Sequence, residues 1–99
     1  MNRLPLLIFF TAARSGPARR MESVLAYIAR KERRRVRVVR VDVGEQPELA
    51  DRFRVMEVPT LVLVKDKRVV GRIDGRASAP AIDRMLEPHL APERELLPA

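Results

Sequence analysis

The stretch Arg14-Ser15-Gly16-Pro17-Ala18 separates an apolar run, Leu6 to Phe10, from a segment with helical periodicity that opens at Arg19. A continuous apolar run of this length is typical of a strand that is buried on both faces. Ser15 is of a type that caps helices, and Pro17 stands where the first turn of a helix accepts proline. The stretch therefore predicts a strand, a tight turn and the start of a helix.

The segments on either side extend this pattern. The helix is predicted from about Ala18 to about Lys31, because its apolar residues repeat with the spacing of a single helical face. These residues are Met21, Val24, Leu25 and Ile28. Val36 to Val43 is rich in β-branched residues, which predicts a second strand. A strand, a crossover helix and a second strand form a right-handed parallel unit.

The second half of the chain predicts a short helix, a hairpin and a last helix. Pro47 opens the short helix, which reaches Phe53. The strands Thr60 to Lys65 and Val69 to Asp74 are joined by a turn at Asp66-Lys67 and are therefore antiparallel. Ser78-Ala79-Pro80 begins the last helix. The apolar face of this helix is Ile82, Met85, Leu86 and Leu90. The order β-α-β-α-β-β-α predicts an α/β fold with a four-stranded mixed sheet and three helices.

Composition indicates one folded domain without cysteine chemistry. The chain has 99 residues, of which 46% are apolar and 33% charged, as in folded domains. We place the domain at residues 1–90 and a loose tail at 91–99. The absence of cysteine excludes a disulfide, a thiolate nucleophile and a cysteine metal site. The single histidine, His89, cannot hold a metal alone, so we expect neither metal nor cofactor.

The charge and the N-terminal segment bear on partners and location. A formal net charge of +7 suits nucleic acid, anionic lipid or an acidic partner, and it also fits an arginine-rich background composition. No apolar run approaches the roughly 20 residues that span a membrane, so we expect no membrane partner. Arg3 to Ala13 is similar to a short signal peptide, but the same residues supply the strand before the turn. The strand interpretation predicts a cytoplasmic protein.

Four elements in this order resemble the thioredoxin family. They are a buried strand, Gly16-Pro17 at a helix start, Val58-Pro59-Thr60 before another apolar strand, and Gly75 beyond the hairpin. The resemblance covers about Leu4 to Leu90. It implies the thioredoxin fold, a cis peptide bond before Pro59, and a groove that this proline and Gly75 line together.

The departures from the family imply that its chemistry is lost. Ser15 and Ala18 stand where the family has its nucleophilic and its resolving cysteine. Phe9 occupies the position of a buried aspartate that assists proton transfer, while Arg14 and Thr11 replace tryptophans. Thiol–disulfide exchange needs one thiolate to attack and a second to resolve. We therefore expect a redox-inactive member of the family, with no catalytic residue, that is not an enzyme.

The groove itself does not require cysteine, so the leading hypothesis is a module that binds a peptide or protein there. In thioredoxins, the residue before the cis-proline pairs its backbone with bound peptide. The residues expected to line the groove are Ser15, Gly16, Pro17, Val58, Pro59 and Gly75, with Arg14 and Arg76 supplying charge.

Other interpretations stay open beside it. Ser15 as a hydrolytic nucleophile would need a nearby base, and its use as a helix cap is favoured. Arg14, Arg19 and Arg20 surround a helix N-terminus, where an anion can bind. The run from Arg30 to Arg37 predicts a basic adaptor for nucleic acid or another polyanion, although a solvated helix end explains it as well. An oxidoreductase whose cysteines were replaced by engineering is a third alternative.

The edge beside Val36 to Val43 also carries an expectation. The first strand and helix of the family, upstream of the central strand, have no counterpart here. In full thioredoxins that strand covers this edge. We expect the edge to be exposed and the chain to form a homodimer through it. Arg35, Arg37 and Arg40 oppose this expectation, because charges along an edge discourage pairing.

Overall fold

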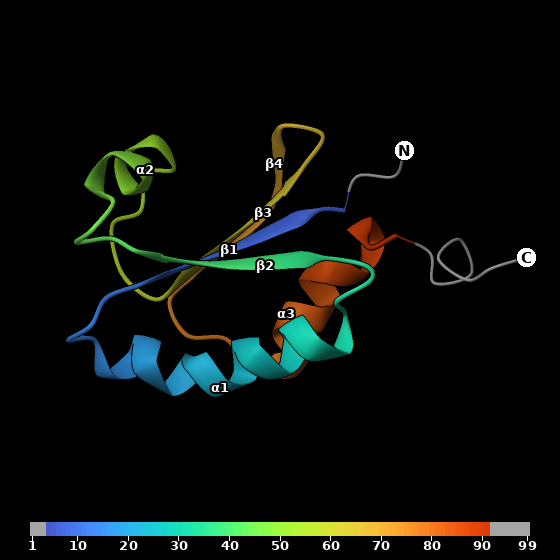
Figure 1. Cartoon of the computed structure of the whole chain (residues 1–99), viewed down its shortest axis with the longest axis horizontal. Coiled ribbons are helices and arrows are strands. Elements are labelled where there is room, and N and C mark those ends of the chain that lie inside the picture. The colour runs from blue at the N-terminus through green and yellow to red at the C-terminus, as the bar shows by residue number, and fades with distance from the viewer. Residues whose placement is uncertain (1–3, 92–99) are drawn as a thin grey trace, which may run out of the picture.

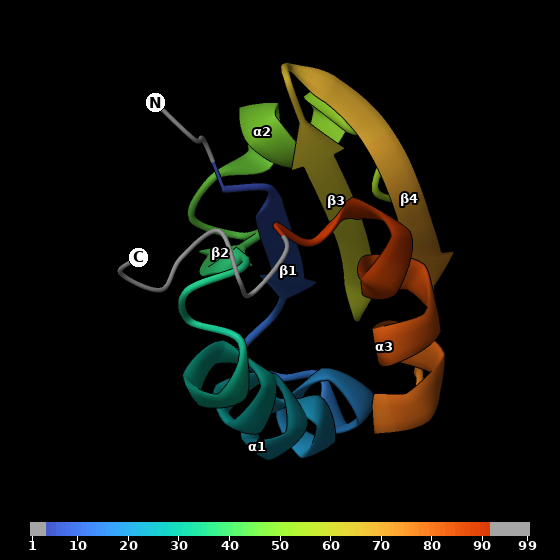
Figure 2. The ribbon, with the colours of Figure 1, turned by 90° about the vertical axis from the view of Figure 1, so that its right-hand side faces the viewer.

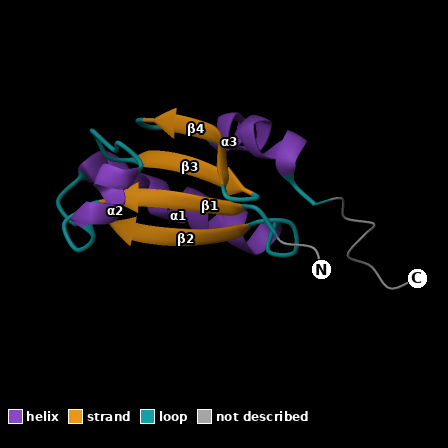
Figure 3. Ribbon diagram, turned by 90° about the horizontal axis from the view of Figure 1, so that it is seen from above, coloured by secondary structure: helices purple, strands orange, loops and turns teal. Residues whose placement is uncertain are grey.

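A four-stranded sheet forms the centre of the computed structural model, which describes residues 4–91 (Figure 1). Its strands lie in the order β2-β1-β3-β4, which Figure 3 shows from above. Strand β1 is parallel to β2, and β3 is antiparallel to both of its neighbours. The bounds are β1 (Leu6–Thr11), β2 (Arg37–Asp42), β3 (Thr60–Lys65) and β4 (Arg68–Asp74). The predicted mixed sheet is confirmed.

The helices cover both faces of this sheet. They are α1 (Gly16–Lys31), α2 (Pro47–Arg52) and α3 (Ala79–Leu86), and α3 continues as a 3₁₀ turn over Glu87–His89. Figures 1 and 2 place α1 and α3 on one face and α2 on the other. The element order β-α-β-α-β-β-α is confirmed. No helix within residues 4–91 is long and apolar enough to cross a bilayer.

Strand β1 contributes to an apolar cluster on each face, because successive side chains of a strand point in opposite directions. Leu7 and Phe9 belong to the cluster under α1 and α3. Ile8 and Phe10 belong to the smaller cluster that meets α2, where the rings of Phe10 and Phe53 are 5.8 Å apart. Burial on both faces explains why the run before the turn has no polar residue.

The observed boundaries differ from the predicted ones by one or two residues. Helix α1 begins at Gly16 rather than Ala18, because Ser15 caps it and Pro17 lies in its first turn. The turn residues Asp66 and Lys67 have φ angles of 52° and 67°, which fit a tight hairpin turn. Leu90 lies beyond α3 but is buried in the cluster below it, as predicted. Residues 92–99 of the predicted tail lie outside the described residues.

Candidate binding groove at the end of the sheet

The predicted groove residues all emerge from one end of the sheet. Phe10 of β1 pairs with Thr60 at the start of β3, and Thr60 pairs with Asp74 at the end of β4. Thr11 and Asp42 end β1 and β2 side by side. The turn into α1, the loop before β3 and the segment after β4 therefore meet at this end. The register places the predicted residues together although they come from three parts of the chain.

Ser15 acts as the cap of α1. Its Oγ accepts a hydrogen bond from the backbone N–H of Ala18 at 3.1 Å, and its own N–H donates to the Ala12 carbonyl at 3.1 Å. The only histidine is far from it. Lys65, at the opposite end of β3 from Thr60, donates to the His89 carbonyl at 3.2 Å. The structure thus confirms the capping role of Ser15 and gives its hydroxyl no imidazole base.

Pro59 and Gly75 are joined as the resemblance implies. The Val58–Pro59 peptide bond is cis, and the Pro59 carbonyl accepts a hydrogen bond from the Gly75 N–H at 2.8 Å. Gly75 has a φ of +87°, which favours glycine. Thr60 Oγ1 donates to the Glu57 carbonyl at 2.7 Å and so holds the other side of the loop. Two segments separated by more than a dozen residues are fixed to each other here.

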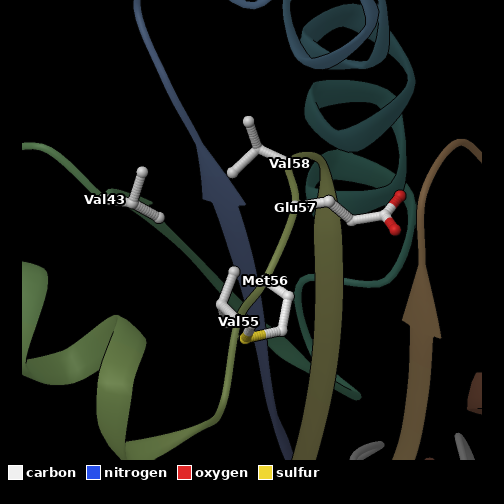
Figure 4. A pocket seen from close by; sticks show the side chains of 5 residues that line it. All are labelled: Val43, Val55, Met56, Glu57 and Val58. Carbon is white, nitrogen blue, oxygen red and sulfur yellow. The ribbon is translucent and has the colours of Figure 1, made fainter.

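An apolar hollow of about 190 Å³ lies beside this loop (Figure 4). Its lining residues are Val43, Val55, Met56, Glu57 and Val58. Met56 is 90% exposed, an unusual state for a large apolar residue. In Figure 4 the Glu57 carboxylate points away from Val43, toward the side of β4. The hollow therefore offers an apolar wall with one acid at its border.

Four residues of this hollow, Val43, Val55, Met56 and Glu57, were not predicted from the sequence. Val43 follows β2, whereas Val55 and Met56 precede the cis-proline loop. One feature of the sequence could have indicated the hollow. Met56 is a large apolar residue in a short loop, and it does not belong to the apolar pattern of any neighbouring helix or strand. Val43 could not be identified in this way, because it directly follows a strand whose valines lie in or beside the core, and it resembles them.

The residue of β1 that stands where the family buries its aspartate, Phe9, is apolar. Phe9 is 2% exposed and packs in the cluster with Met21 and Leu25 of α1. Thr11 is fully buried, and its hydroxyl has no hydrogen-bond partner within the described residues. No carboxylate is therefore buried in β1, where proton transfer to a thiol would need one.

The arginines predicted near this end are all exposed. They are Arg14, Arg19, Arg20 and Arg76. The Arg20 guanidinium lies along the start of α1, since a Cβ on Gly16 would be 3.7 Å from its Nη2 atom. Within residues 4–91, none of the four makes an ion pair. An anion site at this helix start stays a prediction.

Part of the basic run from Arg30 to Arg37 has a structural role. Arg35 bonds Glu32 and Glu87 at 3.2 Å each, and its Nε donates to the Ala91 carbonyl at 2.9 Å. Burial alone would lower the pKa of Arg35, but these carboxylates raise it above its ordinary value. Arg35 is thus engaged within the fold and is not exposed for a phosphate.

Lys31 is engaged in the same way. Its Nζ lies 3.4 Å from Asp83 Oδ2 and 3.9 Å from Glu32, and it sits over the Tyr27 ring. The hydrogen bond to Asp83 raises the pKa of Lys31 above its ordinary value. The exposed cations that remain in the run are Arg30, Arg33, Arg34 and Arg37. Binding of a polyanion there stays a prediction, and fewer cations are free for it than the sequence alone suggested.

Metal binding has no visible basis in this part of the chain. Between residues 4 and 91, no three histidine, aspartate or glutamate side chains converge closely enough to hold an ion.

Comparison with known proteins agrees with this geometry. The family model described as Thioredoxin matches residues 1–88. The thioredoxin of Mycobacterium tuberculosis is 38% identical over 82 residues, which is 83% of this chain and 71% of that protein. A bifunctional thioredoxin reductase/thioredoxin of Mycobacterium leprae is 35% identical over 82 residues, 83% of this chain but only 18% of that protein.

A solved structure shows the same arrangement of elements. The crystal structure of a thioredoxin from Nicotiana alata superposes with a TM-score of 0.83 at 28% sequence identity. The match covers 89% of this chain and 75% of that one. Residues 1–88, which the family model matches, contain the sheet, the three helices and the loop that carries Pro59.

Proposed function

The chain belongs to the thioredoxin family, and we propose that it is a redox-inactive binding module that holds an extended peptide segment of a partner protein in the groove beside Pro59. With no cysteine in the sequence, neither step of thiol–disulfide exchange has its thiolate. The observation that carries the proposal is the apolar hollow bordered by the exposed Met56. An apolar surface of this kind on a folded protein marks a binding site more often than an isolated apolar residue does.

The backbone beside the hollow supports an extended ligand. Within the described residues, neither the N–H nor the C=O of Val58 is hydrogen-bonded to another backbone group. An extended peptide can pair with such groups, and its side chains then enter neighbouring pockets. The hollow would take one apolar side chain, whose burial contributes about 1.5–3 kcal/mol. Glu57, whose carboxylate lies beside Gly75, and the exposed Arg14 and Arg76 would select the flanking charges.

We also propose that the module works in the cytoplasm, as the N-terminal strand suggests. Residues 6–11, which are similar to part of a signal peptide, form the central strand β1 with a neighbour on each side. Removing them would split the sheet, and this supports a module that works in the cytoplasm.

Selection of peptides from a random display library tests the proposal directly. The protein is immobilised without reductant, and the enriched peptides are measured in solution against two variants. Met56→Asp places a charge in the hollow and is expected to weaken binding at least about tenfold, since a buried unpaired charge is costly. Val69→Asp makes the same change at a residue of β4 that is 53% exposed, and it should leave the affinity unchanged.

Two results would contradict the proposal. One is a selection that enriches no peptide, and the other is an equal loss of affinity in both variants. An insulin-reduction assay covers the redox part of the proposal, because turnover above the reductant-only control would refute it. The double variant Ser15→Cys with Ala18→Cys addresses the engineered alternative. Restored reductase activity in this variant would favour a former oxidoreductase.

A further inference from the structure

We infer that the outer edge of β2, together with the cleft between this edge and α1, binds an acidic extended segment of a partner protein as an added strand. This surface lies on the strand farthest from β4, and it is independent of the groove proposed above. Three features of this surface suit such a ligand: the direction of the backbone groups of β2, the shape of the cleft and the charge around it.

The backbone of β2 presents hydrogen-bonding groups to solvent. The N–H groups of Arg37 and Val43 donate toward β1, to the carbonyls of Pro5 and Thr11, at 2.9 Å each. Successive residues of a strand direct their backbone groups to alternate sides. The N–H and C=O groups of Val38 and Arg40 therefore point away from β1, and among residues 4–91 β2 has no other neighbour in the sheet. Such an edge is a template for another strand.

A cleft of about 180 Å³ lies between this edge and α1. Val38 and Arg40 of β2 line it together with Phe9, and α1 contributes Glu22, Leu25, Ala26 and Ala29. The two alanines are short, so the helix leaves space above the edge. In an added strand, the side chains directed toward α1 would enter this space, and the cleft is large enough for an apolar one.

The charge around the edge specifies an acidic occupant. Arg33 and Arg34 lie in the turn before β2, and Arg37 begins the strand on the face opposite Val38. All three are exposed, and within residues 4–91 none is paired with a carboxylate. The Arg40 side chain is already paired with Glu22 at 3.1 Å. A segment with apolar residues toward the cleft and acids toward Arg37 complements this pattern.

A second copy of the chain is a poorer occupant. It would bring the same arginines, and a net charge of +7, against this edge, and like charges across an interface are unfavourable. The homodimer expected from the sequence uses the same backbone groups and stays a prediction. Hydrogen exchange with and without an acidic peptide separates the homodimer from the acidic partner.

The probe is a seven-residue peptide of alternating glutamate and valine with acetylated and amidated ends. Added to the whole chain, it should slow hydrogen exchange at the Val38 and Arg40 amides, which point outward. The Val39 and Val41 amides point toward β1 and should be protected with or without peptide. A peptide with lysine in place of glutamate should not bind. A peptide N-methylated at every residue should also fail, because it has no backbone N–H to donate to the edge on either side.

Two variants of matched charge test the cleft. Ala26→Glu places an acid in the cleft and is expected to weaken binding of the Glu-Val peptide about tenfold, through repulsion and lost space. Ser23→Glu adds the same charge on the same helix outside the cleft lining, so its affinity should match that of the parent chain. Amide spectra of both variants establish that they are folded.

Four results would overturn the inference. The first is peptide binding without slower exchange at Val38 and Arg40, and the second is an equal loss of affinity in both variants. The third is slow exchange at these amides without peptide, with a mass in solution above the 11.3 kDa of one chain, which would assign the edge to a second copy. The last is protection of the same amides by a single-stranded oligonucleotide but not by the peptide.

Discussion

The two ends of the sheet use their positive charge in opposite ways. At the end that carries the Ser15 turn, the exposed Arg14, Arg19, Arg20 and Arg76 form no ion pair within residues 4–91, and the notable feature is an apolar hollow. At the other end, Arg35 and Lys31 are held by Glu32, Glu87 and Asp83. The densest basic stretch of the sequence therefore partly stabilises the fold. The end that resembles a catalytic site keeps its turns without the catalytic groups.

The largest expected effect concerns the core beneath the Ser15 turn. Phe9→Asp restores the acid that the family buries there, but in this chain it would leave a cavity and an unpaired carboxylate among apolar side chains. We expect the free energy of unfolding to fall by about 4 kcal/mol or more, measured by urea denaturation. Phe9→Leu keeps most of the volume and should cost less than about 1.5 kcal/mol. A small loss for Phe9→Asp would mean that this end is open to water.

The second effect is at the opposite end. Arg35→Met removes the bonds to Glu32, Glu87 and Ala91 and leaves the Glu32 carboxylate, which is 9% exposed, with only the more distant Lys31. We expect a loss of about 2 kcal/mol, typical of charged hydrogen bonds. Arg34→Met changes a neighbouring exposed arginine and should stay within about 0.5 kcal/mol. Equal losses would indicate that net charge, rather than the buried pair, stabilises this end.

A smaller effect tests the cap that survives at the former redox position. Ser15→Ala removes the acceptor for the Ala18 N–H and should destabilise the protein by about 1 kcal/mol. Ser23→Ala, on the exposed side of α1, should be neutral or slightly stabilising, because alanine favours helices. Thermal unfolding of the two variants gives the comparison. If both variants behave alike, the hydrogen bond of Ser15 does not contribute to helix stability.

The smallest effect is the pH dependence of the exposed pair at the opposite end. Asp83 raises the pKa of Lys31 in the folded protein above the ordinary value of 10.5. The stability from this pair is therefore fully present below pH 10.5 and is lost as the pH rises through the higher folded value. The urea midpoint of Lys31→Met should lie slightly below that of the parent chain at neutral pH. The difference should vanish at strongly alkaline pH, and a constant difference would assign it to packing on Tyr27.

The sequence predicts what local pattern and turn chemistry control. The apolar run before Ser15, the stripe from Met21 to Ile28 and the turn at Asp66-Lys67 each determine an element by themselves. The position of Gly75 beside Pro59 followed from the family resemblance and not from these patterns. The elements could be predicted because each depends on a short segment, and the contact between Gly75 and Pro59 could be predicted because it belongs to a known motif.

The sequence did not predict features that depend on distant packing. Glu87 pairs with Arg35 across 52 positions, and no local pattern indicates which arginine of the run it will select. Val43 reaches the hollow only because β2 ends beside β1. Ala26 and Ala29 are typical of any helix surface until β2 packs next to them and their short side chains leave a cleft.

The turn at Asp66 and Lys67 has a practical consequence. It is exposed, lies at the end of the hairpin far from Pro59, and belongs to the side of the sheet opposite β2. Because the chain has no thiol, one cysteine introduced at Lys67 would be the unique point for a dye, a spin label or a covalent link to a sensor surface. A molecule attached there presents both the hollow and the β2 edge to solution, so the two surfaces can be assayed on the same immobilised sample.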